Sequence, residues 1–182
     1  MDKRRPGIRM HPSLWRRLDA MARRGFPSFC TLALMLLVAA PFGLDEQAML
    51  MPAVALACVF FWSLFRPASM IPPMVFGIGL VLDLLGYLPI GVGVLTLLVV
   101  HAITMQARHF LVQQGFFLVW FAFLLIAFGA SVLEWLLICV LTLQLLPLAP
   151  ALFQAVVTVA LYPALAMLFS RAHRTIADPE RA

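Results

Sequence analysis

The 182-residue sequence is poor in charged residues and in the side chains from which enzyme active sites are built. Only 12% of its residues are charged, and it has three cysteines, four histidines and two tyrosines. The cysteines lie in apolar stretches at unrelated spacings, so the sequence predicts neither a disulfide framework nor a zinc site. It also lacks a metalloprotease His-Glu pair, a nucleophile elbow, a glycine-rich phosphate loop and a carboxylate cluster for two metals. We therefore expect a protein that is not an enzyme and has no metal or cofactor.

Polar surface is scarce as well. Hydrophobic residues make up 64% of the chain, and the mean hydropathy is +1.01. A water-soluble globule of this size could not bury so much apolar surface, which indicates an integral membrane protein. A membrane β-barrel would alternate polar and apolar residues in segments of about 10, and this alternation is missing. The sequence therefore predicts an all-α, polytopic membrane protein.

What the sequence does contain is a series of six apolar segments, separated by charges, prolines and glycines. We predict transmembrane helices at 26–44, 48–65, 69–88, 90–107, 116–142 and 151–170. They form a transmembrane domain, 26–170, between a basic N-terminal segment, 1–25, and a C-terminal tail, 171–182. In an alternative interpretation the third and fourth segments form a re-entrant hairpin, which leaves four spans and the same sidedness for both termini.

The basic residues lie on one side of this arrangement. Eight of the thirteen precede the first segment, Arg66 and Arg108 lie in the second and fourth connections, and Arg171, Arg174 and Arg181 follow the last segment. The other three connections contain none. Short connections rich in Lys and Arg stay in the cytoplasm, so we expect both termini on the cytoplasmic side of the membrane.

The N-terminal segment has an amphipathic pattern. A helix over 12–24 would place Leu14, Leu18 and Met21 on one face. We expect it to lie on the inner leaflet, until Gly25 and Pro27 redirect the chain into the first span. The candidate membrane-surface residues are Trp15, Arg16, Arg17, Arg23 and Arg24. A solvated cluster of topology-setting charges and a docking site for a cytoplasmic partner are the alternatives.

Two acidic residues fall within predicted spans, where an ionised side chain is costly. Asp83 shares a helical face with Gly79 and Gly86, and small residues let another helix approach closely. Glu134 follows a similar face, formed by Ala127, Ala130 and Ser131. Both acids are candidates for helix packing or for a partner interface, with capping or placement near the headgroups as the simpler alternatives.

His101, in the fourth segment, is the only histidine within a predicted span. We expect it to be a hydrogen-bonded packing residue. A proton relay between His101 and Asp83 is conceivable, but we expect the two residues to lie in opposite halves of the membrane.

The stretch from Met74 to Gly91, MVFGIGLVLDLLGYLPIG, resembles the rod shape-determining protein MreD family. In that family a glycine-bearing helix leads to an Asp, then a short Pro/Gly turn and the next span. The matching positions are Gly79, Asp83, Pro89 and Gly91, and the length and sidedness of the chain also fit. The long basic N-terminal segment departs from family members, which often begin close to the first span.

The resemblance implies a non-enzymatic, multi-pass component of the bacterial inner membrane that belongs to the cell-elongation complex, the elongasome. Its expected partners are MreC, which it would contact directly, and MreB, RodA and the penicillin-binding transpeptidase of RodA, contacted directly or through MreC. We expect membrane lipid around the helices and no nucleic acid as a partner.

An alternative resemblance is to the substrate-binding S components of energy-coupling-factor vitamin transporters. These are six-span proteins of similar size that use small-residue helix faces to dock on a coupling subunit. Ala53 and Ala57 supply such a spacing, but in the second segment, whereas the family has it in the first. The predicted outer connections also offer few polar ligands for a substrate.

Overall fold

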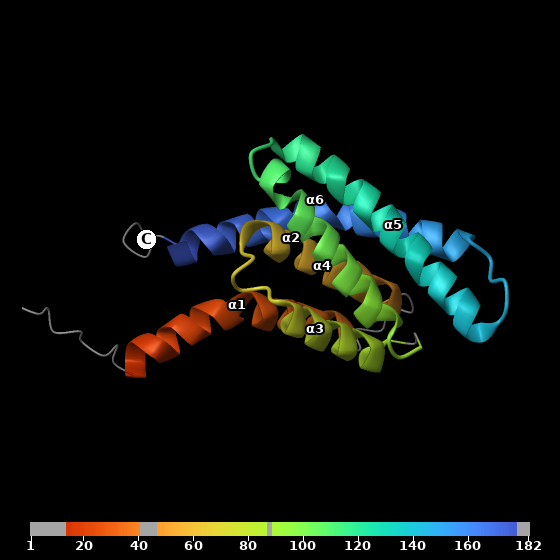
Figure 1. Ribbon diagram of the computed structural model, residues 1–182, viewed down its shortest axis with the longest axis horizontal. Helices are drawn as coiled ribbons and strands as arrows, with labels where there is room; N and C mark the ends of the chain where they lie inside the picture. The colour runs from red at the N-terminus through yellow and green to blue at the C-terminus, as the bar shows by residue number, and fades with distance from the viewer. Residues whose placement is uncertain (1–13, 41–46, 87–88, 178–182) are drawn as a thin grey trace, which may run out of the picture.

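The protein folds as a bundle of α-helices, seen in the computed structural model of Figure 1. The structure describes residues 14–40, 47–86 and 89–177, and the side chains of 25–40, 50–86 and 89–169. Within these ranges the elements are α1 (Leu14–Ala39), α2 (Gln47–Phe65), α3 (Pro72–Leu85), α4 (Val92–Leu111), α5 (Phe116–Thr142) and α6 (Ala149–Ala177). The described residues contain no strand, which agrees with the all-α prediction.

Helix α2 lies at the centre of the bundle and packs against α1, α3, α4 and α6. All of its residues from 53 to 64 are buried. The sequence explains this position, because α2 is apolar on every side and a helix of that kind is expected to be surrounded by other helices. Ala53 and Ala57 are both fully buried within the chain. They are therefore not available at the surface of this chain as a docking face for a coupling subunit.

Among the residues that the structure describes, three helices are long and apolar enough to cross a membrane: Val92–Leu111, Phe116–Thr142 and Ala149–Phe169. Three shorter apolar helical stretches, Gly25–Ala39, Leu50–Phe65 and Pro72–Leu85, accompany them. Helix α3 has 14 residues. At about 1.5 Å per residue it is roughly 21 Å long, against about 30 Å for the hydrocarbon core.

Local sequence sets several helix ends. Pro72 occupies the first position of α3, where its missing N–H costs nothing, so this helix begins three residues after the expected start of the third segment. Helix α4 runs to Leu111, beyond the expected end at 107. Helix α5 spans the expected range 116–142, and Leu143 ends it in the left-handed region with φ 53°.

The expected break at Gly25 and Pro27 is wrong, since α1 continues through both residues from Leu14 to Ala39. Proline removes one backbone hydrogen bond from a helix without always ending it. The Thr31 hydroxyl donates to the carbonyl of Pro27 at 2.8 Å, one turn before it. The amphipathic segment and the first apolar segment therefore belong to one helix, not to two helices joined at a bend.

Aromatic side chains fill the space between α2, α5 and α6. The rings of Phe123 and Tyr162 stack with centroids 4.2 Å apart, and Phe60 contacts both rings. Nearer the end of α2, Trp62 and Phe169 lie with centroids 5.2 Å apart. These contacts hold α6 against the central helix, with the favourable geometry of offset and edge-to-face ring pairs.

Candidate functional site

Asp83 connects the end of α3 to the start of α4. It lies in the last turn of α3 and is only 3% exposed. Its Oδ2 accepts hydrogen bonds from the backbone N–H groups of Gly91 at 2.7 Å and Val94 at 3.3 Å, and its Oδ1 accepts one from Gly93 at 2.8 Å. The first N–H groups of a helix have no partner within that helix, and its N-terminus carries partial positive charge. Asp83 therefore caps α4 from the neighbouring helix.

Three glycines make this cap possible. Gly91 precedes α4 with φ 103°, a backbone conformation that residues other than glycine rarely adopt. A Cβ on Gly79 would lie 2.6 Å from the Cα of Val94, so the backbones of α3 and α4 approach closely there. A Cβ on Gly93 would meet the carboxyl group of Asp83. The backbone of α4 therefore lies against the face of α3 that carries Gly79 and Asp83.

The remaining predicted positions of this region belong to the same turn. Gly86 follows α3, and its N–H donates to the carbonyl of Leu82 at 2.8 Å. The carbonyl of Pro89 accepts from the N–H of Val92 at 3.2 Å. We refer to the unit formed by Gly79, Asp83, Gly86, Pro89, Gly91 and Gly93 as the α3–α4 cap.

His101 is a packing residue, as the sequence predicts. It is 5% exposed, and its Nδ1 lies 2.7 Å from the hydroxyl oxygen of Ser63 on α2. The carboxylate oxygens of Asp83 accept hydrogen bonds from backbone N–H groups at the start of α4, and none of these comes from His101. The described geometry thus contains no direct hydrogen bond for the His101–Asp83 relay.

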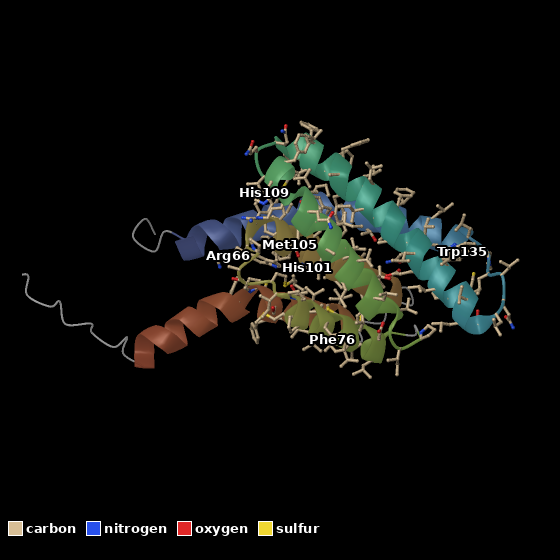
Figure 2. The ribbon with its side chains drawn as sticks, in the orientation of Figure 1. Arg66, Phe76, His101, Met105, His109 and Trp135 are labelled. Atoms are coloured by element: carbon tan, nitrogen blue, oxygen red, sulfur yellow. The ribbon has the colours of Figure 1, made fainter. Side chains whose placement is uncertain are left out.

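Arg108, near the end of α4, contacts the end of α2. Its Nε donates to the carbonyl of Leu64 at 3.1 Å, near the C-terminus of α2. A cation is favourable there, because the last carbonyls of a helix are unpaired and carry partial negative charge. Figure 2 shows Arg66 and His109 toward this end of the bundle and Trp135 toward the other. The ends of α2 and α4 that carry Arg66 and Arg108 therefore lie together.

Glu134 lies on α5 beside a cavity of about 160 Å³ between α5 and α6. The neighbouring Ser131 is buried, and the indole N–H of Trp135 donates to the carbonyl of Leu146 at 3.1 Å. Ala127 and Ala130 are buried too, so the small-residue face before Glu134 packs inside the bundle. Glu134 itself is half-buried.

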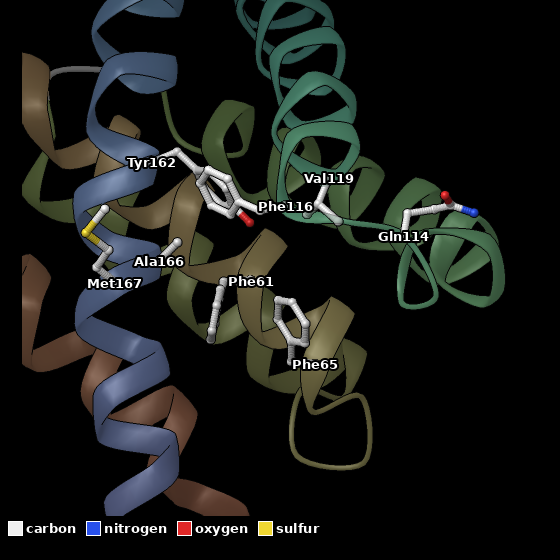
Figure 3. Close-up of a pocket in the computed structure, with 8 residues that line it drawn as sticks. All are labelled: Phe61, Phe65, Gln114, Phe116, Val119, Tyr162, Ala166 and Met167. Carbon is white, nitrogen blue, oxygen red and sulfur yellow. The ribbon is translucent and has the colours of Figure 1, made fainter.

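A second cavity, of about 360 Å³, lies between α2, α5 and α6. Figure 3 shows the rings of Phe61, Phe65 and Tyr162 around it, with Gln114 at its edge. Aromatic and aliphatic carbon makes up most of its lining, and such a cavity favours apolar occupants. It contains none of the residues that the sequence singled out.

Two further predictions concern metal binding and the membrane-surface residues. Among the described residues, no group of three His, Cys, Asp or Glu side chains could hold a metal ion. The backbone of α1 includes the five candidate membrane-surface residues, but their side chains lie outside the described part. These are Trp15, Arg16, Arg17, Arg23 and Arg24.

Three residues of these sites were missed by sequence reasoning. Gly93 repeats the glycine two positions after Gly91, and this spacing next to a helix start was a readable signal. Gln154 lines the cavity beside Glu134. Ser63 and Gln154 carry no such signal, because each is a single polar residue within a run of apolar ones. Their roles depend on which helices become neighbours.

No family model matches the chain, and neither the curated proteins nor the solved structures show significant similarity to it.

Proposed function

We propose that this protein is a non-enzymatic, multi-pass component of the cell-elongation complex in the bacterial inner membrane. It scaffolds MreC and links cytoskeletal MreB to peptidoglycan synthesis by RodA and its penicillin-binding transpeptidase. The proposal rests on the resemblance to the MreD family and on the geometry of the residues that carry it.

The observation that carries the proposal is the α3–α4 cap. The four positions that match the family lie at separate points of an 18-residue stretch, and they meet in one unit, in which Asp83 binds the first turn of α4. A charged side chain used in this way fixes the orientation of two helices without any ligand. A rigid helix pair with a fixed outer face suits a scaffold.

The outer face of α3 offers a contact surface. Phe76, Leu80 and Leu84 follow one another at intervals of four residues and are 50%, 37% and 66% exposed. Residues at this spacing lie on one face of a helix. An apolar face of this kind can pack against lipid or against the transmembrane helix of a bitopic partner such as MreC.

The proposal includes six membrane crossings with both termini in the cytoplasm. The hydrogen bond from Arg108 to Leu64 supports this sidedness, because it brings together the ends of α2 and α4 that bear isolated arginines. In this arrangement α3, with 14 residues, is the shortest of the described helices that cross the membrane. The basic N-terminal segment then faces the anionic inner leaflet and MreB.

Depletion of the protein in its rod-shaped host tests this function. We expect cells to become round, and affinity-tagged protein to copurify with MreC. Normal rods after depletion contradict the proposal. Copurification with an ATPase module and a retained vitamin-sized ligand would instead identify a transporter component.

A further inference from the structure

The cavity between α5 and α6 is lined by two polar side chains, one a hydrogen-bond acceptor and the other a donor, that have no partner among the described residues. Glu134 makes no hydrogen bond or ion pair with any residue that the structure describes. The amide Nε2 of Gln154, on the other wall, is a buried donor without a partner in that same part of the chain. Buried polar groups are normally paired, and leaving one unpaired costs about 1–3 kcal/mol. Glu134 and Gln154 both line this cavity, so it has a carboxylate acceptor on one wall and an amide group on the other.

The size of this space fits a small headgroup. A water molecule needs about 10–15 Å³ of the same kind of volume, so about 160 Å³ holds a group of several heavy atoms. A ligand that pairs both walls must present a cationic donor to Glu134 and an acceptor to Gln154. An ammonium group a few bonds from a phosphate oxygen has this composition.

The side of the cavity formed by the connection between α5 and α6 is apolar. Leu146, Pro147 and Pro150 line it and are exposed, and Leu143 and Leu145 beside them are 90% and 91% exposed. A free polar solute would leave these leucines in contact with water. An amphiphile would cover them with its acyl chains while its headgroup enters the cavity.

We propose that this cavity binds the headgroup of a phospholipid with a primary amine, such as phosphatidylethanolamine. The ammonium group donates to the Glu134 carboxylate, and a phosphodiester oxygen accepts from Gln154. A choline headgroup carries no N–H to donate, and a glycerol headgroup carries no cation. The site depends on the placement of α5 and α6 in a membrane and not on the proposed role in cell elongation.

Native mass spectrometry of the purified protein tests this inference. The protein in detergent is incubated with phosphatidylethanolamine, phosphatidylcholine and phosphatidylglycerol that share the same acyl chains. We expect the ethanolamine lipid to be retained about tenfold better than the other two, as befits one charge-assisted hydrogen bond. Equal retention of the three lipids overturns the proposal.

Variants locate the site. Glu134→Gln keeps the shape of the side chain and removes its charge, and Gln154→Leu removes the amide donor. Glu134→Gln should abolish the preference for the ethanolamine lipid. Gln154→Leu should weaken retention of all three lipids, because each carries the phosphodiester group that Gln154 would bind. Gln106→Leu, at an exposed position on α4, should change neither. Circular dichroism checks that each variant is folded.

Two outcomes of the variant series contradict the inference. One is an unchanged lipid preference in folded Glu134→Gln, and the other is unchanged retention of all three lipids in folded Gln154→Leu. If Glu134→Gln keeps its lipid preference and loses a copurifying membrane protein, the carboxylate instead pairs with a basic side chain of that partner. Cell shape after depletion is a separate readout, so failure here and failure of the proposed function are distinguishable.

Discussion

The Oδ1 atom of Asp83 lies 2.8 Å from the backbone nitrogen of Gly93, across the turn that joins α3 to α4. This hydrogen bond forms only because Gly93 has no Cβ, which would occupy the place of the carboxyl group. An acid within an apolar helix is thereby explained without a substrate, a metal or a proton path. It gives α4 a cap that the first turn of that helix could not provide for itself.

The Asp83→Asn substitution should destabilise the bundle. The amide keeps one acceptor oxygen but turns its NH₂ group toward backbone donors, and the favourable charge at the helix N-terminus disappears. We expect a loss of about 1–3 kcal/mol in the free energy of unfolding. Unfolding in mixed detergent micelles, followed by circular dichroism, measures it, with the exposed Leu84→Ala as control.

The same variant should weaken the copurification of MreC, because the α3–α4 cap sets the outer face of α3. Stability equal to that of the unmodified protein would show that the three hydrogen bonds of Asp83 contribute nothing measurable. Unchanged copurification and cell shape would remove Asp83 from the proposed function.

Two glycines of α3 should respond in opposite ways to the same change. In Gly79→Ala the new methyl group would meet the backbone of Val94 at 2.6 Å, so the helices must separate, at a cost of about 1–3 kcal/mol. In Gly77→Ala the methyl group meets nothing within 4 Å, and stability should stay equal or rise by up to about 1 kcal/mol. Melting temperatures of the two variants give the comparison, and equal losses would argue against the close approach at Gly79.

The pairing of His101 with Ser63 predicts a cost for removing the hydroxyl. Ser63→Ala leaves the buried Nδ1 of His101 unpaired, and we expect a loss of about 1–3 kcal/mol. Thr96→Val is the matched control, because the Thr96 hydroxyl is buried without a partner among the described residues. Its replacement by a methyl group should be neutral or stabilising. Chemical denaturation measures the free energy of unfolding of both variants. A larger loss of this free energy for Thr96→Val than for Ser63→Ala would contradict this account.

The proposed sidedness can be read by labelling of single cysteines. After replacement of the three native cysteines, Gln144→Cys should react with a membrane-impermeant maleimide in intact spheroplasts. Gln114→Cys should react only after the membrane is opened. Labelling of Gln114→Cys from outside would reverse the proposed orientation.

The sequence was sufficient for the features that depend on apolar runs and on short-range spacing. The all-helical architecture, the range of α5 and the close approach at Gly79 follow from such patterns. The continuity of α1 through Pro27 did not follow, because a proline can end a helix or be accommodated in it, and packing decides which.

Long-range pairs were beyond the reach of the sequence. The bond between His101 and Ser63 and the meeting of Glu134 with Gln154 in one cavity depend on how α2 packs against α4 and α5 against α6. Periodicity identifies the face on which a residue lies, but not the helix that covers it. The role of Asp83 was predictable in part. Capping was one of the alternatives that its sequence allowed, but the sequence did not show that α4 is the helix it caps.

Site-specific photocrosslinking in growing cells tests the central claim most directly. A photoreactive residue is placed at Phe76 or Leu84 on the outer face of α3, and at Val156 on α6, which is 56% exposed, as a control. We predict a covalent adduct with MreC from both α3 positions and none from Val156. Adducts of equal yield from all three positions, or no MreC adduct from α3, would contradict the claim that this helix pair scaffolds MreC.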